Sequence, residues 1–225
     1  MAPPVVTIGS FDGVHLGHSK LISRIVEQSG KSGGESVILT FFPHPKMVLN
    51  PEEHGVELLS STQEKIALLE KSGIDTLIIQ PFSRDFSEMT AEVFIREVIS
   101  GALQTKHLVI GYDHRFGNRR SGGIADLQVI GHQLGFTVEE IPEQEVDAMA
   151  VSSSRIRTAL KSSEIPVANN LLGRPYSLTG LVVRGERLGT TLGFPTANIQ
   201  VKESYKLVPA EGVYVAQAEI GRAHV

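Results

Sequence analysis

The sequence contains no cysteine, which excludes disulfide bonds, catalysis by a thiolate and metal sites built from cysteine. It also lacks a basic surplus, because 21 lysines and arginines stand against 25 aspartates and glutamates, for a formal net charge of -4. A protein that binds nucleic acid generally shows such a surplus. We therefore expect no nucleic-acid partner.

Long apolar runs are missing as well. None approaches the roughly 20 residues that a membrane-spanning helix needs, and the first residues have neither the basic nor the apolar region of a secretory signal. We expect a cytoplasmic protein with no membrane partner, and the sequence leaves its oligomeric state open. The 225 residues, 41% of them hydrophobic, are enough for one large domain or for a medium domain with part of a second.

Strand-like and helix-like segments alternate over the first 141 residues. Strands are expected at 5–9, 36–42, 75–80, 106–111 and 136–141, with helices at 16–28, 62–71, 91–102 and 124–134. This alternation predicts the α/β class, with a parallel sheet that carries helices on both faces. Ligands of such sheets bind beyond the carboxyl ends of the strands, near the point where the strand order reverses.

The composition changes beyond residue 150. Short helices are expected at 152–163 and 165–172, and short strands at 177–184, 196–201 and 212–220, with a glycine-rich turn at 185–193. Short strands separated by such turns, without helices, predict the opening of a β-barrel or sandwich. We place a domain boundary near residue 174, which gives domains 1–174 and 175–225. About 50 residues are too few to close most independent barrels.

The segment 9–18, Gly-Ser-Phe-Asp-Gly-Val-His-Leu-Gly-His, joins the first strand to the first helix. A strand that turns through glycines into a helix forms a phosphate site, because the first N–H groups of the helix have no internal partner and its dipole favours an anion. His15 and His18 are three residues apart, so they share one helix face. A single histidine here would be interpreted as a helix cap. Two at this spacing, with three glycines, favour phosphate binding.

Two other strand ends carry unusual residues. In 41–45, Phe-Phe-Pro-His-Pro, the prolines end a strand, and the paired aromatics could equally form an apolar slot for a planar ligand. In 111–117, Gly-Tyr-Asp-His-Arg-Phe-Gly, an acid, a base and two aromatics lie between glycines, and an ordinary solvated loop is the alternative.

The segment 151–157, Val-Ser-Ser-Ser-Arg-Ile-Arg, opens a helix with hydroxyl groups. Serines are good N-caps, which is one explanation of the pattern. A serine-rich helix start with arginine in its first turn is also an anion site, able to hold the far end of a triphosphate. Because it occurs together with 9–18, we favour the second explanation.

These segments together resemble one family. The segment 9–18 resembles the HxGH motif of the nucleotidyltransferase superfamily, and 152–155 resembles its second phosphate-binding motif. With 41–45, 111–117 and 185–198 in this order, the whole chain is similar to the bifunctional bacterial riboflavin kinases/FMN adenylyltransferases, or FAD synthetases. Two positions depart from that pattern. Ser154 stands where the family commonly has threonine, and His114 where it often has phenylalanine.

The resemblance implies a Rossmann-like, HUP-type nucleotidyltransferase domain that makes FAD and pyrophosphate from FMN and ATP, with Mg²⁺ bridging phosphates. It implies catalytic roles for His15, His18, Ser153 and Arg155. It implies nucleotide contacts from Gly9, Phe11, Asp12, Gly17, Ser152 and Ser154. It implies flavin contacts from Phe41, Pro43, His44, Asp113, Arg115 and Phe116.

For 175–225 the resemblance implies the opening strands of a riboflavin kinase barrel. Gly185, Thr196 and Asn198 would contact the nucleotide there, and Thr196 and Asn198 also Mg²⁺. The family's catalytic glutamate lies further along that barrel, so we expect a kinase fragment without kinase activity. ATP, FMN and riboflavin are the expected small-molecule partners. Two alternatives stay open: another small-substrate nucleotidyltransferase, and a flavin- or nucleotide-binding fragment without turnover.

Overall fold

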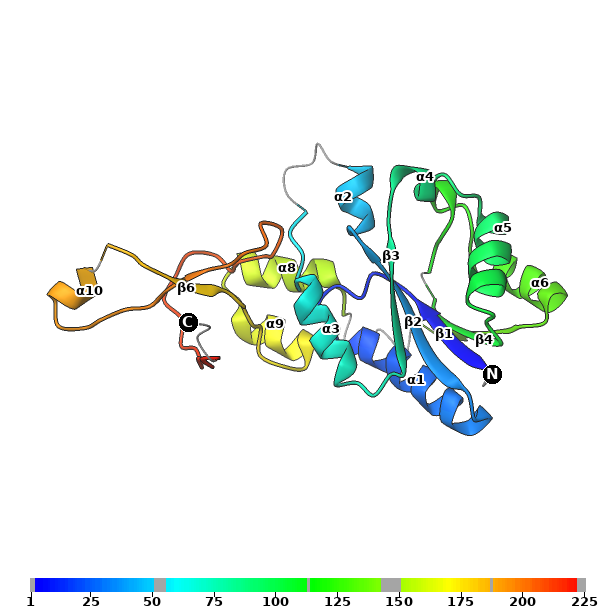
Figure 1. The fold of residues 1–225 in the computed structure, drawn as a ribbon, viewed down its shortest axis with the longest axis horizontal. Helices are drawn as coiled ribbons and strands as arrows, with labels where there is room; N and C mark the ends of the chain where they lie inside the picture. The colour runs from blue at the N-terminus through cyan, green and yellow to red at the C-terminus, as the bar shows by residue number, and fades with distance from the viewer. Residues whose placement is uncertain (1–2, 51–55, 113, 143–150, 187, 222–225) are drawn as a thin grey trace.

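The sheet that organises the molecule is all-parallel (Figure 1). A computed structural model describes residues 3–50, 56–112, 114–142, 151–186 and 188–221. The strands are β1 (Pro4–Ile8), β2 (Glu35–Phe42), β3 (Thr76–Pro81), β4 (His107–Gly111) and β5 (Thr137–Ile141). Their order is β3-β2-β1-β4-β5, so it reverses between β1 and β4. The predicted α/β class and parallel sheet are confirmed.

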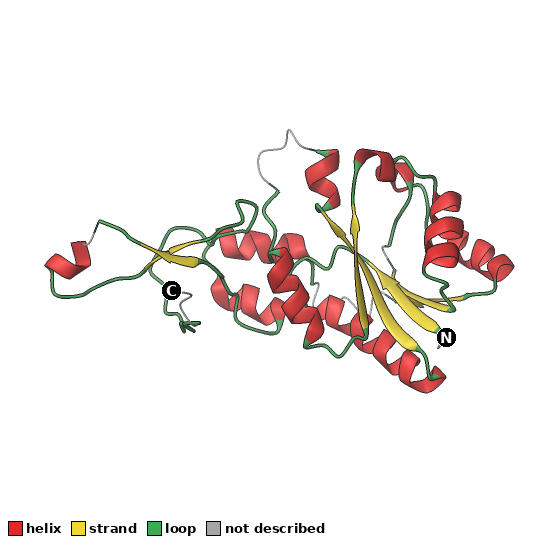
Figure 2. Ribbon diagram, viewed as in Figure 1, coloured by secondary structure: helices red, strands yellow, loops and turns green. Residues whose placement is uncertain are grey.

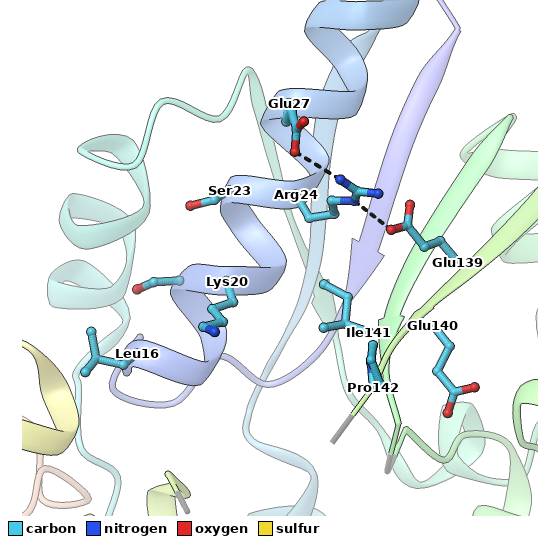
Figure 3. A pocket seen from close by; sticks show the side chains of 10 residues that line it. Leu16, Lys20, Ser23, Arg24, Glu27, Glu139, Glu140, Ile141 and Pro142 are labelled. Atoms are coloured by element: carbon cyan, nitrogen blue, oxygen red, sulfur yellow. Dashed lines mark hydrogen bonds and ion pairs between the residues drawn. The ribbon is translucent and has the colours of Figure 1, made fainter. Parts of the chain in front are cut away.

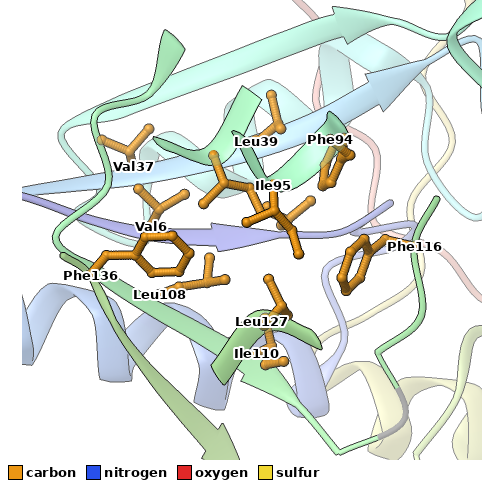
Figure 4. Close-up of a cluster of buried hydrophobic side chains, with 12 residues drawn as sticks. Val6, Val37, Leu39, Phe94, Ile95, Leu108, Ile110, Phe116, Leu127 and Phe136 are labelled. Atoms are coloured by element: carbon orange, nitrogen blue, oxygen red, sulfur yellow. The ribbon is translucent and has the colours of Figure 1, made fainter. Parts of the chain in front are cut away.

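Helices cover both faces of this sheet (Figure 2). The helices concerned are α1 (Leu16–Ser32), α3 (Thr62–Glu70), α5 (Ala91–Val93), η1 (Phe94–Ala102) and α6 (Ile124–Leu134). Side chains alternate along a strand, so Val6 and Ile8 of β1 join the cluster under η1 and α6, drawn in Figure 4, while Val5 joins the cluster under α1 and α3.

The helix expected at 91–102 is built differently from an α-helix. Only Ala91–Val93 is α-helical, and Phe94–Ala102 forms a π-helix. Its wider turn is visible at the end, where the N–H of Leu103 donates to the carbonyl of Val98 at 2.9 Å. The short helices α2 (Pro45–Leu49), α4 (Arg84–Ser87) and η2 (Asn118–Arg120) were not expected, because one or two turns carry too little periodicity.

Beyond residue 150 the prediction holds in part. The helices α8 (Ser153–Lys161) and α9 (Ile165–Leu172) form, and β6 (Leu181–Val183) pairs antiparallel with β7 (Asn198–Gln200). The expected turn at 185–193 contains the helix α10 (Leu188–Thr191). The prediction of a strand at 212–220 is wrong. Its described residues pair with no other strand, and its side chains, such as Val213 and Val215, are exposed to solvent.

A third apolar cluster, the α8–α9 cluster, draws on both parts of the chain. It combines Ile156 and Leu160 of α8 with Leu171 of α9, Leu59 from the segment before α3, and Leu207 from near the C-terminal end. Among the described helices, none has the length and apolar content to cross a membrane.

Candidate active site

The site forms around the loop between β1 and α1, at the carboxyl edge of the sheet. Phe11 and Val14 adopt positive φ angles of 47° and 40°, and Gly13 one of 79°. A left-handed backbone at residues other than glycine persists only where the surroundings hold it in place. At Gly13 a Cβ would also lie 2.8 Å from the side chain of Leu59. The loop is therefore tight and packed directly against the segment before α3.

His15 and His18 form a reciprocal cap at the start of α1. The Nδ1 of His15 accepts the N–H of His18 at 3.3 Å, and the Nδ1 of His18 accepts the N–H of His15 at 3.3 Å. The rings stack with centroids 3.6 Å apart. Because each Nδ1 accepts a backbone N–H, a neutral imidazole carries its proton on Nε2. The histidines thus cap the helix through one nitrogen and offer the other as a donor.

Both imidazoles are neutral near pH 7. Burial lowers the pKa of His15 to about 4, and the charge of Arg174 acts in the same direction. Burial also lowers the pKa of His18 well below its usual range, with smaller contributions from His15 and Lys65. The positive charge at this site therefore comes from neighbouring lysine and arginine side chains.

Asp12 ties the loop to two other elements. Its carboxylate is 1% exposed. It accepts the N–H of Leu59 at 2.8 Å and of Ser60 at 3.3 Å, and pairs with the guanidinium of Arg157 at 2.6 Å. These protein partners turn the carboxylate inward. The side chain of Asp12 therefore organises the loop, and its contact with a nucleotide stays a prediction.

The start of α8 lies beside this loop. The hydroxyl of Ser153 donates to the carbonyl of Asp12 at 3.0 Å. Ser152 is the N-cap of α8, and its hydroxyl accepts the N–H of Arg155 at 3.2 Å. Ser154 and Arg155 are exposed at the first turn. Two helix N-termini, each a favourable place for an anion, therefore meet at Asp12.

The remaining predicted nucleotide contacts lie in the loop and the first turn of α1. Gly17 is buried in that first turn. Gly9 lies under the ring of Phe11, because a Cβ there would be 3.1 Å from that ring. The ring of Phe11 is itself buried and lies 5.1 Å from the ring of His18. The ring of Phe11 therefore packs against the ring of His18.

Three buried or half-buried cations lie near the loop, and the sequence analysis included only Arg157 among them, as part of the segment 151–157. Lys65 of α3, 5% exposed, donates to the carbonyl of Ser10 at 2.7 Å. Arg157 of α8 binds Asp12, and Arg174, beyond α9, binds loop carbonyls. One signal was available: Lys65 precedes Leu69 by four residues and so shares its buried face. Lys65 and Arg174 therefore bring positive charge to the loop, whereas the charge of Arg157 is paired with Asp12.

The end of β2 also reaches the site. His44 is buried and caps α2, its Nδ1 accepting the N–H of Lys46 at 3.2 Å. Burial lowers the pKa of His44 to about 4, and the charges of Arg157 and Lys65 add to this effect. Pro43, half-buried, follows a cis peptide bond.

The aromatic residues predicted to bind a planar ligand fall into two groups. Phe41, half-buried, lies 5.7 Å from the ring of Phe82 and 5.9 Å from that of Phe86. Phe116 is buried in the sheet core, with its ring 5.6 Å from that of Phe94. Phe41 thus lies at the edge of an aromatic cluster, whereas Phe116 belongs to the core.

The remaining predicted residues belong to the loop after β4 and to the C-terminal part. Arg115 is exposed, with its guanidinium over Gly123, and Asp113 lies outside the described residues. In the C-terminal part, a Cβ at Gly185 would overlap the side-chain amide of Asn198, so these two predicted residues are neighbours. Thr196 is exposed.

A groove of about 550 Å³ lies between α1 and the end of β5 (Figure 3). It is lined by charges of both signs, including Lys20, Arg24 and Glu139, and it reaches the first turn of α1 through Leu16 and Ser19. None of the predicted site residues lines it, so we place the chemistry at the loop. In the described part of the chain no group of three His, Asp or Glu side chains is arranged to hold a metal ion.

Comparison with known proteins gives consistent matches. The FAD synthetase family model matches residues 2–155, and the riboflavin kinase model matches residues 172–225. The bifunctional riboflavin kinase/FMN adenylyltransferase of Listeria monocytogenes is 36% identical over 98% of this chain and 70% of its own length. The Bacillus subtilis protein of the same name is 37% identical over 97% of this chain and 68% of its own. A crystal structure from Streptococcus pneumoniae, described as a macrolide-efflux protein, superposes with a TM-score of 0.83 at 31% identity, covering 95% of this chain and 68% of that one.

Proposed function

Because the chain belongs to the family of bifunctional riboflavin kinases/FMN adenylyltransferases, we propose that it transfers AMP from MgATP to FMN. An oxygen of the FMN phosphate attacks the α-phosphorus of ATP. The bond from that phosphorus to the bridging oxygen breaks, pyrophosphate leaves, and FAD forms. Little covalent chemistry is demanded of the protein, so catalysis comes from positioning and from charge stabilisation.

The observation that carries this proposal is the meeting of two helix N-termini at Asp12, through the bond from Ser153 at 3.0 Å. The start of α1, with the Nε2–H groups of His15 and His18, suits the phosphate oxygens on which charge develops. The start of α8, with Ser154 and Arg155, suits the departing pyrophosphate. Ser152 and Ser153 contribute through the helix start that they shape.

Magnesium enters this reaction with the nucleotide. Mg²⁺ takes few ligands from proteins when phosphates and water can supply them. The nearest carboxylate of the loop, Asp12, is paired with Arg157, and the described residues offer no cluster of carboxylates. MgATP is therefore the form of the substrate that fits these residues.

For the flavin, the proposal uses the ends of β2 and β4. Phe41, Pro43 and His44 would line one side of the ring system. Arg115 and Asp113 would lie on the loop after β4, with Phe116 anchoring that loop in the core. In the part matched by the riboflavin kinase model, Gly185, Thr196 and Asn198 would contact a nucleotide and its Mg²⁺.

The test is FAD formation from FMN, ATP labelled at the α-phosphate and Mg²⁺, followed by chromatography. Loss of one charge-stabilising donor at such a site costs about 100- to 1,000-fold in turnover. We expect that loss for His15→Ala and for His18→Ala. Near-normal turnover in both variants would contradict the assignment, and binding of FMN and ATP without product would favour a binding module.

Matched controls separate the donor from the cap. Asparagine is a good N-cap, so His15→Asn keeps the helix start and removes the Nε2–H, and we expect it to lose FAD formation while staying folded. His132→Ala, an exposed histidine on α6, should leave turnover unchanged.

A further inference from the structure

Arg174 lies immediately after α9 and its cap, and it reaches back to the loop between β1 and α1. Its Nη1 donates to the carbonyl of Val14 at 2.9 Å, and its Nη2 donates to the carbonyl of Gly13. A third bond, from Nη1 to the carbonyl of Leu172 at 3.3 Å, ties the guanidinium to its own helix end. One rigid fork therefore holds two successive peptide groups of the phosphate loop. We propose that Arg174 is a positioning residue for the adenylyl-transfer site.

The residue before Arg174 brings the two elements together. Gly173 caps α9 in a left-handed conformation, with φ 72°. A Cβ at Gly173 would lie 2.5 Å from the side chain of Leu16, in the first turn of α1. The end of α9 therefore lies close to the start of α1, and its left-handed backbone favours glycine at this position. This contact leaves Arg174 opposite the loop carbonyls.

Two residues after Arg174, Tyr176 is anchored to α9 and to the segment near Leu207. The N–H of Tyr176 donates to the side chain of Asn169 at 2.7 Å, and its hydroxyl donates to the carbonyl of Leu207 at 2.7 Å. The ammonium of Lys206 lies 4.3 Å from the centre of the Tyr176 ring and donates to the carbonyl of Leu59 at 2.6 Å. Leu59 in turn donates its N–H to Asp12.

Residues matched by the riboflavin kinase model therefore support a loop matched by the FAD synthetase model. The segment 205–207 pairs with Leu58, whose N–H donates to the carbonyl of Tyr205 at 2.6 Å and whose carbonyl accepts the N–H of Leu207 at 2.8 Å. Residues on both sides of the boundary that we place near residue 174 therefore contact the segments that form the site. Arg174 lies at that boundary.

The chemistry of the fork explains what it does for the reaction. Buried carbonyl groups need a donor, and two of them facing a triphosphate would repel it. Arg174 satisfies both carbonyls and adds a positive charge beside His15. It also holds Val14 in its strained conformation, with φ 40°. Lysine has a single ammonium on a flexible stem, so it cannot reproduce the planar two-donor geometry.

The experiment rests on the proposed function and compares FAD formation in three variants. A small misplacement remote from the reacting atoms can cost about 100-fold, so we expect Arg174→Leu to lower kcat/KM for ATP by about 10- to 100-fold. Arg174→Lys should fall between that variant and the wild type. Arg184→Leu, an exposed arginine in the C-terminal part, should match the wild type.

A second readout does not depend on activity. Burial and the charges of Arg174 and Arg157 lower the pKa of His15, and His18 and Asp12 are its other titratable neighbours in the loop. NMR titration of the imidazole should show this pKa higher in Arg174→Leu and unchanged in Arg174→Lys and Arg184→Leu. A lowered kcat/KM in Arg174→Lys at an unchanged His15 pKa would assign the effect to the two-donor geometry of the fork rather than to its charge.

The outcomes separate the two proposals. A wild-type protein that makes no FAD would overturn the proposed function. A wild-type protein that makes FAD, with Arg174→Leu and Arg174→Lys both as active as the wild type, would overturn the role of Arg174. If Arg174→Leu does not fold, Arg174→Lys decides the question, since a wild-type kcat/KM in that variant would show that the fork is not needed.

Discussion

A histidine that caps a helix through Nδ1 still has Nε2–H for a ligand, and the start of α1 contains two such residues. The reciprocal bonds of His15 and His18 fix both tautomers and both ring planes before any substrate arrives. Fixed neutral donors need no reorganisation when charge develops on a phosphate oxygen. The nearby cations Lys65 and Arg174 supply the long-range attraction.

Burial of neutral histidines makes stability depend on pH. His15 and His44 each have a pKa of about 4 in the folded protein, against about 6.5 in an unfolded chain. Between these values the unfolded chain binds more protons, so the free energy of unfolding falls as the pH falls from about 6.5 to about 4. Each histidine contributes up to about 1.4 kcal/mol per pH unit in that window.

Urea unfolding at a series of pH values between 7 and 4 measures this slope. Asparagine keeps the cap of α2, so His44→Asn should remove one histidine from the slope while α2 stays formed. His132→Asn, at an exposed position, should leave the slope as it is. An identical slope in wild type and His44→Asn would show that His44 is not buried neutral.

The local sequence was enough to find His15, His18 and the serines before α8, because glycines, caps and hydroxyls at a helix start are features of neighbouring residues. The partners of these residues could not be found in this way. Asp12 and Arg157 are 145 positions apart, and Lys65 and Arg174 bind carbonyl groups, which every residue has. Such contacts depend on which elements the fold brings together.

At the scale of elements, the site depends on how α8 is attached to the loop before α1. The attachment has two parts, the hydroxyl of Ser153 on the carbonyl of Asp12 and the guanidinium of Arg157 on its carboxylate. Arg157 also donates to the carbonyl of Glu57 at 2.8 Å, so it joins α8, the loop and the segment before α3. A change at Asp12 should therefore loosen α8 as a unit.

We expect Asp12→Asn to destabilise the protein by about 3 kcal/mol, because breaking a buried ion pair leaves the partner charge uncompensated. The Arg157 side chain is 17% exposed, so water recovers only part of the loss. Urea unfolding gives the free energy, and hydrogen exchange should show faster exchange of the α8 amides. Asp85→Asn, at an exposed position in α4, is the control. Equal stability of Asp12→Asn and wild type would mean that the pair does not anchor α8.

The long helices and strands could be predicted from the periodicity of apolar residues, because buried strands and amphipathic helices leave clear patterns in the sequence. The differences have physical reasons. The π-helix at Phe94–Ala102 has the same apolar residues as an α-helix and differs in hydrogen bonding. The expected strand at 212–220 has suitable residues, but a strand exists only with a neighbour, and the described chain supplies none.

At the scale of the whole molecule, the C-terminal part contributes to the stability of the part that carries the site. Leu207 is fully buried in the α8–α9 cluster. Its N–H and the carbonyl of Tyr205 pair with Leu58, one residue before the chain binds Asp12. A loss of packing at Leu207 should therefore affect the N-terminal ends of both α1 and α8.

We expect Leu207→Ala to lower the free energy of unfolding by about 2–5 kcal/mol, the usual cost of removing a buried leucine side chain. Because the cavity would open against Ile156 and Leu160, hydrogen exchange should accelerate in α8, and FAD formation should fall with it. Val208→Ala, at a side chain 54% exposed, should change neither. Urea unfolding and hydrogen exchange measure both effects. If Leu207→Ala lost stability while α8 kept its wild-type protection, the C-terminal segment would be packed on the site domain without supporting it.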